Sequence, residues 1–232
     1  MEDILRAGFA QLGIPVTEAA LAQLRAYYAL LEEKNAVMNL TAIRGEADTA
    51  RLHFLDCGAL LRYLDLPGKA VADVGSGAGF PGLVLKILCP ELTLTTLDSL
   101  QKRIAFQQQV TDALGLTDVF PTARRAEEAV DLRESFDIVT SRAVANLSML
   151  SELCLPLVRP GGVFAAMKGP EPEAELAQAR RAISLLGGGE PRVEKYTIPG
   201  TDVTHALVLI PKAAPTPKKY PRRFSLMKKQ PL

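Results

Sequence analysis

The sequence contains no tryptophan, two histidines and three cysteines among 232 residues. Cys57, Cys89 and Cys154 lie far apart and form no CxxC pair, which disfavours a zinc site and a disulfide framework. No apolar run approaches the length of a membrane span. The opening "MEDILRAGFAQLG" is acidic and amphipathic, whereas a signal peptide has a basic end and an apolar block. We therefore expect a soluble, cytoplasmic protein.

Acidic residues are missing from the C-terminal segment. Residues 212–232 contain seven basic residues and no acidic one, although the net charge of the whole chain is only +1, so the rest of the chain carries −6. A basic tail on a mildly acidic body is typical of a chain that meets a polyanion with one end. A disordered tail that only aids solubility is an equally good interpretation of the charge alone.

The first third of the chain has the periodicity of helices. In "TEAALAQLRAYYALLEEKN", Leu21, Leu24 and Leu31 recur at helical spacing, and Thr17 is the predicted N-cap. A further amphipathic helix is predicted over "EADTARLHFLDCGALLRYL", and "LDLPGK" ends the pattern. We interpret residues 1–65 as an N-terminal helical region.

Short apolar strands then alternate with helices over residues 66–211. This alternation predicts a mostly parallel sheet covered by helices on both faces, an α/β fold. The last two predicted strands, "RVEKYTI" and "HALVLI", have no helix between them and should form an antiparallel hairpin at the edge. A helix is also predicted over "ARRAEEAV". Residues 212–232 are rich in proline and lysine, so we expect an extended tail that is loosely tied to the core.

A glycine loop, "GSGAGFPG", follows the first predicted strand, where open parallel sheets bind ligands. A dinucleotide fingerprint beginning at Gly75 requires its third glycine at the position of Phe80. Pro81 should open the next helix, and neither a proline nor a bulky aromatic residue suits a pyrophosphate. The Walker pattern also fails, because no Gly-Lys-Ser/Thr follows.

A ligand without phosphate suits this loop better, and S-adenosylmethionine is such a ligand. Glycines let the backbone approach the ligand, and Asp73 lies where a carboxylate favours a positive charge. Asp98 follows the second predicted strand, where an acidic residue can accept hydrogen bonds from both ribose hydroxyls. The alternative role for Asp98 is to cap the helix "SLQKRIAF".

Several blocks in order resemble the RsmG (GidB) family: "NLTAI", "HFLDC", "DVGSGAGFPGLVLKI", "LDSLQKRIAF", "ARRAEE", "TSRAVANL", "AMKGP" and "YPRR". The resemblance spans nearly the whole chain. It implies a Rossmann-like class I methyltransferase fold and S-adenosylmethionine-dependent methylation of N7 of a guanine in small-subunit ribosomal RNA. The partner would be that RNA or the ribosomal subunit, and we expect a monomer.

The resemblance also implies which residues bind. The cofactor-binding residues implied are Gly75, Gly77, Gly79, Phe80, Asp98, Ala126, Glu127 and Arg142. The candidate RNA-facing residues are Asn39, His53, Arg142, Lys168, Arg222 and Arg223. For three of them a structural role is the alternative: a surface ion pair for Arg142, a core hydrogen bond for His53 and a helix end for Asn39.

The C-terminal segment departs from the family pattern. Phe224 to Met227 stand where a glycine and a proline are expected after "YPRR", so the resemblance does not extend to the path of this segment.

The chemistry implied requires no general base, because N7 of guanine has a free lone pair and carries no proton. No catalytic residue and no metal ligand stand out in the sequence. Three alternatives stay open: a methyltransferase for a small molecule or protein, an RNA-binding assembly factor with little catalysis, and a dinucleotide oxidoreductase.

Overall fold

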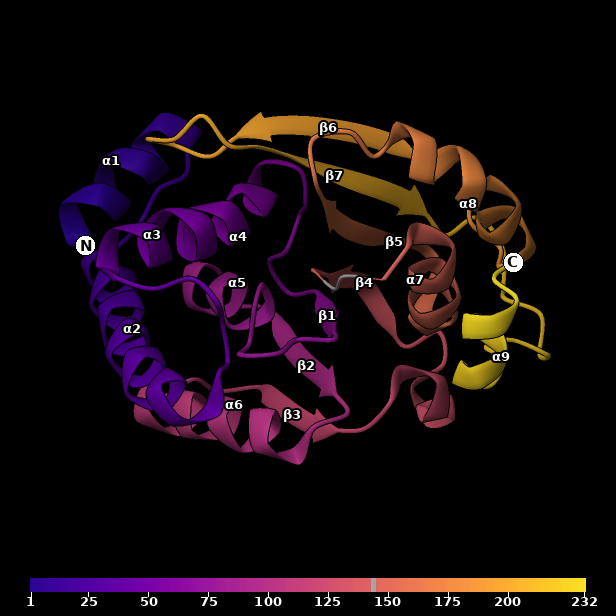
Figure 1. The fold of residues 1–232 in the computed structure, drawn as a ribbon, viewed down its shortest axis with the longest axis horizontal. Coiled ribbons are helices and arrows are strands. Elements are labelled where there is room, and N and C mark those ends of the chain that lie inside the picture. The colour runs from indigo at the N-terminus through magenta and orange to yellow at the C-terminus, as the bar shows by residue number, and fades with distance from the viewer. Residues whose placement is uncertain (143–144) are drawn as a thin grey trace.

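The computed structural model describes residues 1–142 and 145–232. A seven-stranded sheet in the order β3-β2-β1-β4-β5-β7-β6 runs through it (Figure 1). β1 to β5 are parallel, and β7 is antiparallel to both β5 and β6. The predicted parallel sheet and the hairpin at its edge are both confirmed. The strands are β1 (Ala70–Val74), β2 (Thr93–Asp98), β3 (Val119–Ala123), β4 (Phe136–Ser141), β5 (Val158–Lys168), β6 (Arg192–Thr197) and β7 (Thr204–Pro211).

Helices connect the parallel strands and set the position of the ligand-binding edge. The chain proceeds from β1 outward through β2 to β3, and then returns to place β4 on the other side of β1. The carboxyl ends of β1 and β4 therefore flank the point where strand order reverses, the usual ligand site in such sheets. The connecting helices are α5 (Gly82–Leu88), α6 (Gln101–Ala113), α7 (Leu147–Cys154) and α8 (Glu173–Leu185).

The N-terminal region is helical, as predicted, and begins with α1 (Glu2–Leu12) and α2 (Glu18–Met38). Thr17 is the N-cap of α2, and its Oγ1 accepts a hydrogen bond from Ala20 N at 3.1 Å. The predicted helix over "EADTARLHFLDCGALLRYL" is helical but irregular. It consists of α3 (Glu46–Thr49), a π-helical turn (Ala50–Leu55), α4 (Asp56–Gly58) and a 3-10 turn (Ala59–Arg62).

Two apolar cores lie on the two faces of the sheet. One core packs α1, α2, α5 and α6 against residues such as Val71, Leu94 and Ala165. The other packs α7 and α8 against the alternate residues, including Ala72 and Phe164. Because successive side chains of a strand point to opposite faces, central strands such as β1 and β5 contribute residues to both cores. Figure 1 shows the two groups of helices on either side of the sheet.

The prediction of a helix over "ARRAEEAV" is wrong. The chain forms two 3-10 turns there, Ala126–Glu128 and Val130–Leu132. Arg124 explains the difference: its backbone N donates to Asp98 O at 3.0 Å, and its guanidinium donates to Glu128 O at 2.7 Å and to Asp131. These tertiary contacts engage the polar groups that a regular helix would use, and they override the local propensity.

The prediction of a loosely tied tail is also wrong. Lys212, Thr216, Tyr220 and Met227 are buried, and residues Phe224–Lys229 form a short helix, α9. The Arg133 guanidinium donates to Tyr220 O at 2.7 Å and also to Thr216 O. Apolar and carbonyl partners thus fix a segment whose composition alone indicates disorder.

The sheet ends in strands β3 and β6. Pro121 has no backbone N–H and therefore interrupts the row of hydrogen-bond donors along β3, which lies at the edge beside β2. β6 carries Arg192, Glu194 and Lys195, with ion pairs from Arg192 to Glu194 at 2.9 Å and from Lys195 to Glu173 at 2.6 Å. Within the described residues, no helix has the length and apolar character needed to cross a bilayer.

Candidate functional site

The glycine loop joins β1 to α5 and is held from both sides. Gly75 N donates to Leu97 O at 2.8 Å, which ties the loop to the end of β2. Tyr27 OH, from α2, donates to Ala78 O at 2.5 Å in a fully buried contact. Gly77 has φ 58°, a left-handed conformation that favours glycine, and space is open where a Cβ would lie. These contacts fix the shape of the loop.

Asp98 organises the loop from the end of β2. Its Oδ2 accepts from Gly77 N at 3.0 Å and from the Arg103 guanidinium at 3.2 Å, and its Oδ1 accepts from Leu100 N at 2.9 Å. Asp98 thus contacts Leu100, the N-cap residue of α6, but no side chain among the described residues caps this helix, so the capping alternative for Asp98 is wrong. The side chain is 4% exposed, and that part faces a cavity.

A cavity of about 230 Å³ lies beyond the carboxyl ends of β1 and β2. We call it the β1–β2 cavity. It brings together four residues that the resemblance implied for the cofactor: Gly75, Asp98, Ala126 and Glu127. Ala126 and Glu127 enter through the first 3-10 turn rather than through a helix. Phe224 of α9 also borders the cavity, which the sequence did not predict.

The charges around the β1–β2 cavity are paired. Three arginines border it, but Arg103 lies 3.2 Å from Asp98, Arg125 lies 3.8 Å from Glu127, and Arg124 pairs with Asp131. A pyrophosphate needs unpaired donors, and these guanidinium groups are neutralised by carboxylates. The residues present fit an uncharged nucleoside end better than a phosphate.

Four residues of the implied cofactor set do not border this cavity: Gly77, Gly79, Phe80 and Arg142. Phe80 is 4% exposed and stacks on His53, with ring centroids 4.2 Å apart, inside the core of the N-terminal helices. A Cβ on Gly79 would lie 2.5 Å from Leu83 Cδ1, so this glycine is needed for close packing. The structure gives Phe80 and Gly79 a packing role.

Arg142 also lies elsewhere, in a second cavity of about 370 Å³ beyond β4, β5 and β7. We call it the β4–β7 cavity, and Asp56, Lys168, Glu175 and His205 share in lining it. The sequence did not predict Asp56, Glu175 or His205 as site residues, although "HFLDC" contains Asp56. Residues 143–144 of the motif "TSRAVANL" lie outside the described residues.

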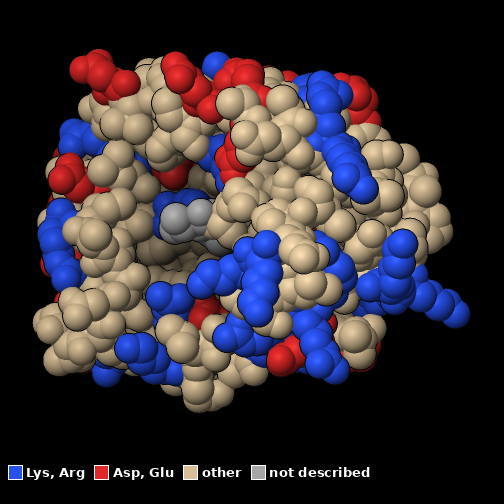
Figure 2. All heavy atoms as spheres, turned by 45° about the vertical axis from the view of Figure 1, so that its right-hand side comes forward, with Lys and Arg blue, Asp and Glu red and all other residues tan. Residues whose placement is uncertain are grey.

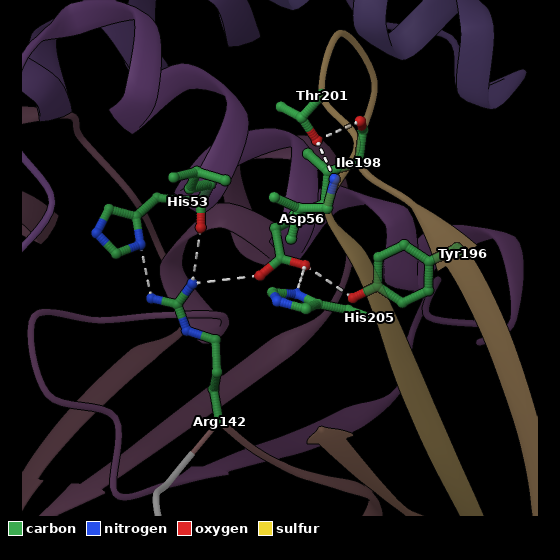
Figure 3. A network of polar contacts seen from close by, with 9 residues as sticks. His53, Asp56, Arg142, Tyr196, Ile198, Thr201 and His205 are labelled. Carbon is green, nitrogen blue, oxygen red and sulfur yellow. Dashed lines mark hydrogen bonds and ion pairs between the residues drawn. The ribbon is translucent and has the colours of Figure 1, made fainter. Parts of the chain in front are cut away.

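Asp56 is the centre of a buried network in this cavity (Figure 3). Its Oδ1 accepts from Tyr196 OH and from His205 Nδ1, each at 2.8 Å, and its Oδ2 lies 3.5 Å from the Arg142 guanidinium. The carboxylate is 1% exposed and raises the pKa of His205 through its hydrogen bond. The network joins the N-terminal helical region to β4, β6 and β7.

His53 is a structural residue in this network. Arg142 donates to His53 Nδ1 at 2.8 Å, and because a guanidinium has no acceptor, Nδ1 must accept. The proton therefore lies on Nε2, which donates to Thr41 Oγ1 at 2.9 Å. Burial, aided by the charge of Arg142, lowers the pKa of His53 to about 3, so the ring is neutral. The core hydrogen-bond alternative describes His53 correctly.

The remaining RNA-facing candidates are spread over the surface. Lys168 lies in the β4–β7 cavity and donates to Glu175 and to Ala145 O, both at 2.8 Å. Asn39 is the left-handed C-cap of α2, as the helix-end alternative predicted. Arg222 is occupied by the buried Glu152, whereas Arg223 is exposed.

Asp73 lies beneath the glycine loop instead of facing a cavity. Its Oδ2 accepts from Gly82 N at 2.8 Å at the start of α5, and the side chain is fully buried. Burial raises the pKa of this carboxyl to about 7. Asp73 thus anchors the loop to α5.

The surface between the cavities and the tail is basic. Figure 2 shows a hollow in this face, with lysines and arginines gathered along its lower rim and beside it. Arg125, Arg222 and Arg223 border a shallow groove next to the β1–β2 cavity.

A family model described as rRNA small subunit methyltransferase G matches residues 20–202. The chain belongs to the GidB family. A relative named ribosomal RNA small subunit methyltransferase G from Lactobacillus johnsonii is 44% identical, and the alignment covers 99% of each of the two chains. A relative of the same name from a Geobacillus species is 46% identical, over 95% of this chain and 94% of the other.

Solved structures share the fold of the GidB chain. TrmN from Thermus thermophilus superposes with a TM-score of 0.54 at 22% identity, over 67% of this chain and 48% of the other. TYW2 from M. jannaschii, in complex with AdoMet, gives a TM-score of 0.54 at 14% identity, over 67% and 74% of the two chains. The Rossmann-like fold is confirmed. Membership of this family identifies the chain as a methyltransferase that uses S-adenosylmethionine as its methyl donor.

Proposed function

We propose that this chain transfers a methyl group from S-adenosylmethionine to N7 of a guanine in small-subunit ribosomal RNA. The observation that carries the proposal is the β1–β2 cavity, which gathers the glycine loop, Asp98 and the turn at Ala126 in a chain of the GidB family. Relatives of nearly full coverage are named for this RNA. We further predict that the chain acts as a monomer in the cytoplasm.

The cofactor residues of the proposal are those of the implied set that border the β1–β2 cavity, together with Gly77, whose backbone N donates to Asp98. Gly75 and Gly77 give backbone access to the ligand, and Asp98 accepts hydrogen bonds from the ribose hydroxyls. The backbone at Ala126 and Glu127 reads the adenine edge. Phe80, Gly79 and Arg142 are left out of this contact set, because their side chains or Cβ positions face other parts of the molecule.

The acceptor guanine enters, in this proposal, from the β4–β7 cavity. This cavity lies at the same edge of the sheet, across the reversal point between β1 and β4. Lys168 and Arg142 are donors suited to the O6 acceptor of guanine, and Glu175 is a carboxylate close to where positive charge develops. Arg223 and the neighbouring exposed cations contact RNA phosphates, which give affinity with little sequence choice.

In this proposal the protein promotes methyl transfer by holding the guanine and the methyl donor in the geometry of the reaction. When bound, the cofactor supplies a methyl group on a sulfonium. The chain needs no general base, because the N7 lone pair attacks without losing a proton. The buried cysteines are poor nucleophiles, since burial raises the pKa of Cys57 and of Cys154. Holding acceptor and donor in line can supply about 7–11 kcal/mol of the barrier.

The proposal is tested with small subunits from cells that lack this chain. Incubation with the purified protein and S-adenosylmethionine, followed by nuclease digestion and mass analysis, should reveal new 7-methylguanosine. Asp98→Ala should weaken cofactor binding in calorimetry, whereas Asp112→Ala, which removes an exposed carboxylate from the following helix α6, should not. Unchanged 7-methylguanosine, or wild-type cofactor affinity in Asp98→Ala with the fold intact by circular dichroism, contradicts the proposal.

A further inference from the structure

The C-terminal tail is fastened on both sides of Phe224. Two residues before it, the Arg222 guanidinium donates to both carboxylate oxygens of Glu152, at 2.8 and 2.6 Å. Glu152 lies on α7 and is 1% exposed. Three residues after Phe224, Met227 is completely buried in the core under α7. Phe224 therefore has a fixed position at the start of α9.

That position is at the β1–β2 cavity. Phe224 borders this cavity together with Gly75, Asp98 and Ala126, and it is 37% exposed. The Arg125 guanidinium lies 5.1 Å from the centroid of its ring. The tail thus contributes an aromatic surface to a cavity whose other walls come from the ends of β1 and β2 and from the turn at Ala126.

The chemistry of this surface fits one part of the ligand. Aromatic rings stack favourably on nucleobases, because every base presents an apolar π-face. The methionine end of S-adenosylmethionine carries charges and is better suited to polar groups. The proposed adenine contacts at Ala126 and Glu127 border the same cavity as Phe224.

We propose that Phe224 is the wall against which the adenine of S-adenosylmethionine stacks, so that the C-terminal tail is part of the cofactor site. This inference rests on the proposed function, because it specifies one contact within the same cavity. It assigns the tail a role in cofactor affinity that is separate from any contact of its cations with RNA.

Removal of the ring tests the stacking. Phe224→Ala should bind S-adenosylmethionine about tenfold more weakly in calorimetry, the typical effect of losing one aromatic platform for a base. Phe224→Tyr keeps the ring and should bind like the wild type. Leu226→Ala is the matched control, because Leu226 is a similarly exposed apolar residue of α9 that does not border the cavity.

The lack of tryptophan offers a direct readout of contact. Phe224→Trp places a single indole at the cavity, and Leu226→Trp places one beside it on the same helix. Emission of Phe224→Trp should be quenched to saturation by S-adenosylmethionine and by adenosine, but not by methionine. Emission of Leu226→Trp should stay constant in all three titrations.

The outcomes separate this inference from the proposed function. If the wild type binds the cofactor and methylates small subunits while Phe224→Ala binds equally well, the stacking is refuted and the function stands. Quenching of Phe224→Trp by methionine but not by adenosine also refutes it. If the wild type binds no S-adenosylmethionine, both the proposed function and the inference fail.

Discussion

Replacing Asp56 with alanine should destabilise the fold strongly, because this carboxylate is buried and shared by three partners. Its removal leaves Tyr196 OH without its acceptor, and it leaves the Arg142 guanidinium without its nearest carboxylate. Breaking a buried pair by deleting one partner costs about 3–5 kcal/mol. We expect the free energy of unfolding, measured by urea titration, to fall by about that amount.

Two variants make the Asp56 prediction sharper. Asp56→Asn keeps an oxygen that can accept from Tyr196 OH, so its loss should be smaller than that of Asp56→Ala. Asp65→Ala removes a carboxylate that is 85% exposed in the same region, and it should change stability by no more than about 0.5 kcal/mol. A loss of less than about 1 kcal/mol for Asp56→Ala would refute the view that this network joins the helical region to the sheet.

Two further predictions concern other buried polar groups. Tyr27→Phe removes the hydroxyl that holds Ala78 O, so unfolding should become easier by about 1–3 kcal/mol and cofactor affinity should fall; unchanged urea midpoints would contradict this. Burial lowers the pKa of Lys212 from 10.5 to about 8, so between these values the unfolded chain holds a proton that the folded chain has lost. Stability relative to Lys212→Met should therefore rise as pH increases through this window, and parallel pH profiles of the two proteins would show that the buried amine does not titrate in this way.

The sheet was predictable because its signals are local. Each strand is a short apolar run between turn residues, and the missing helix between the last two strands forces an antiparallel pair. Thr17 and Asn39 were likewise recognisable as helix ends, since capping depends on adjacent residues. The proposed cofactor residues Gly75 and Asp98 follow from strand order and from the edge where such sheets bind ligands.

What sequence reasoning missed depends on contacts between distant segments. The resemblance implies Phe80 as a ligand residue, and the sequence did not reveal that α2 and the π-helical turn supply the rings that bury it. The network at Asp56 joins residues 140 and 149 positions further along the chain, a separation that no local pattern reveals. The tail was misread for the same reason, because Glu152 and Arg133, its partners, lie far from it in sequence.

The outer strands of the sheet bear on how the protein behaves at high concentration. An unprotected outer strand invites a second molecule to continue the hydrogen-bond ladder, which leads to aggregation. Pro121 in β3 withholds a donor, and the charged side chains of β6 at Arg192, Glu194 and Lys195 make an incoming strand costly to desolvate. Both borders thus disfavour strand addition, so concentrated samples should resist the formation of intermolecular sheets.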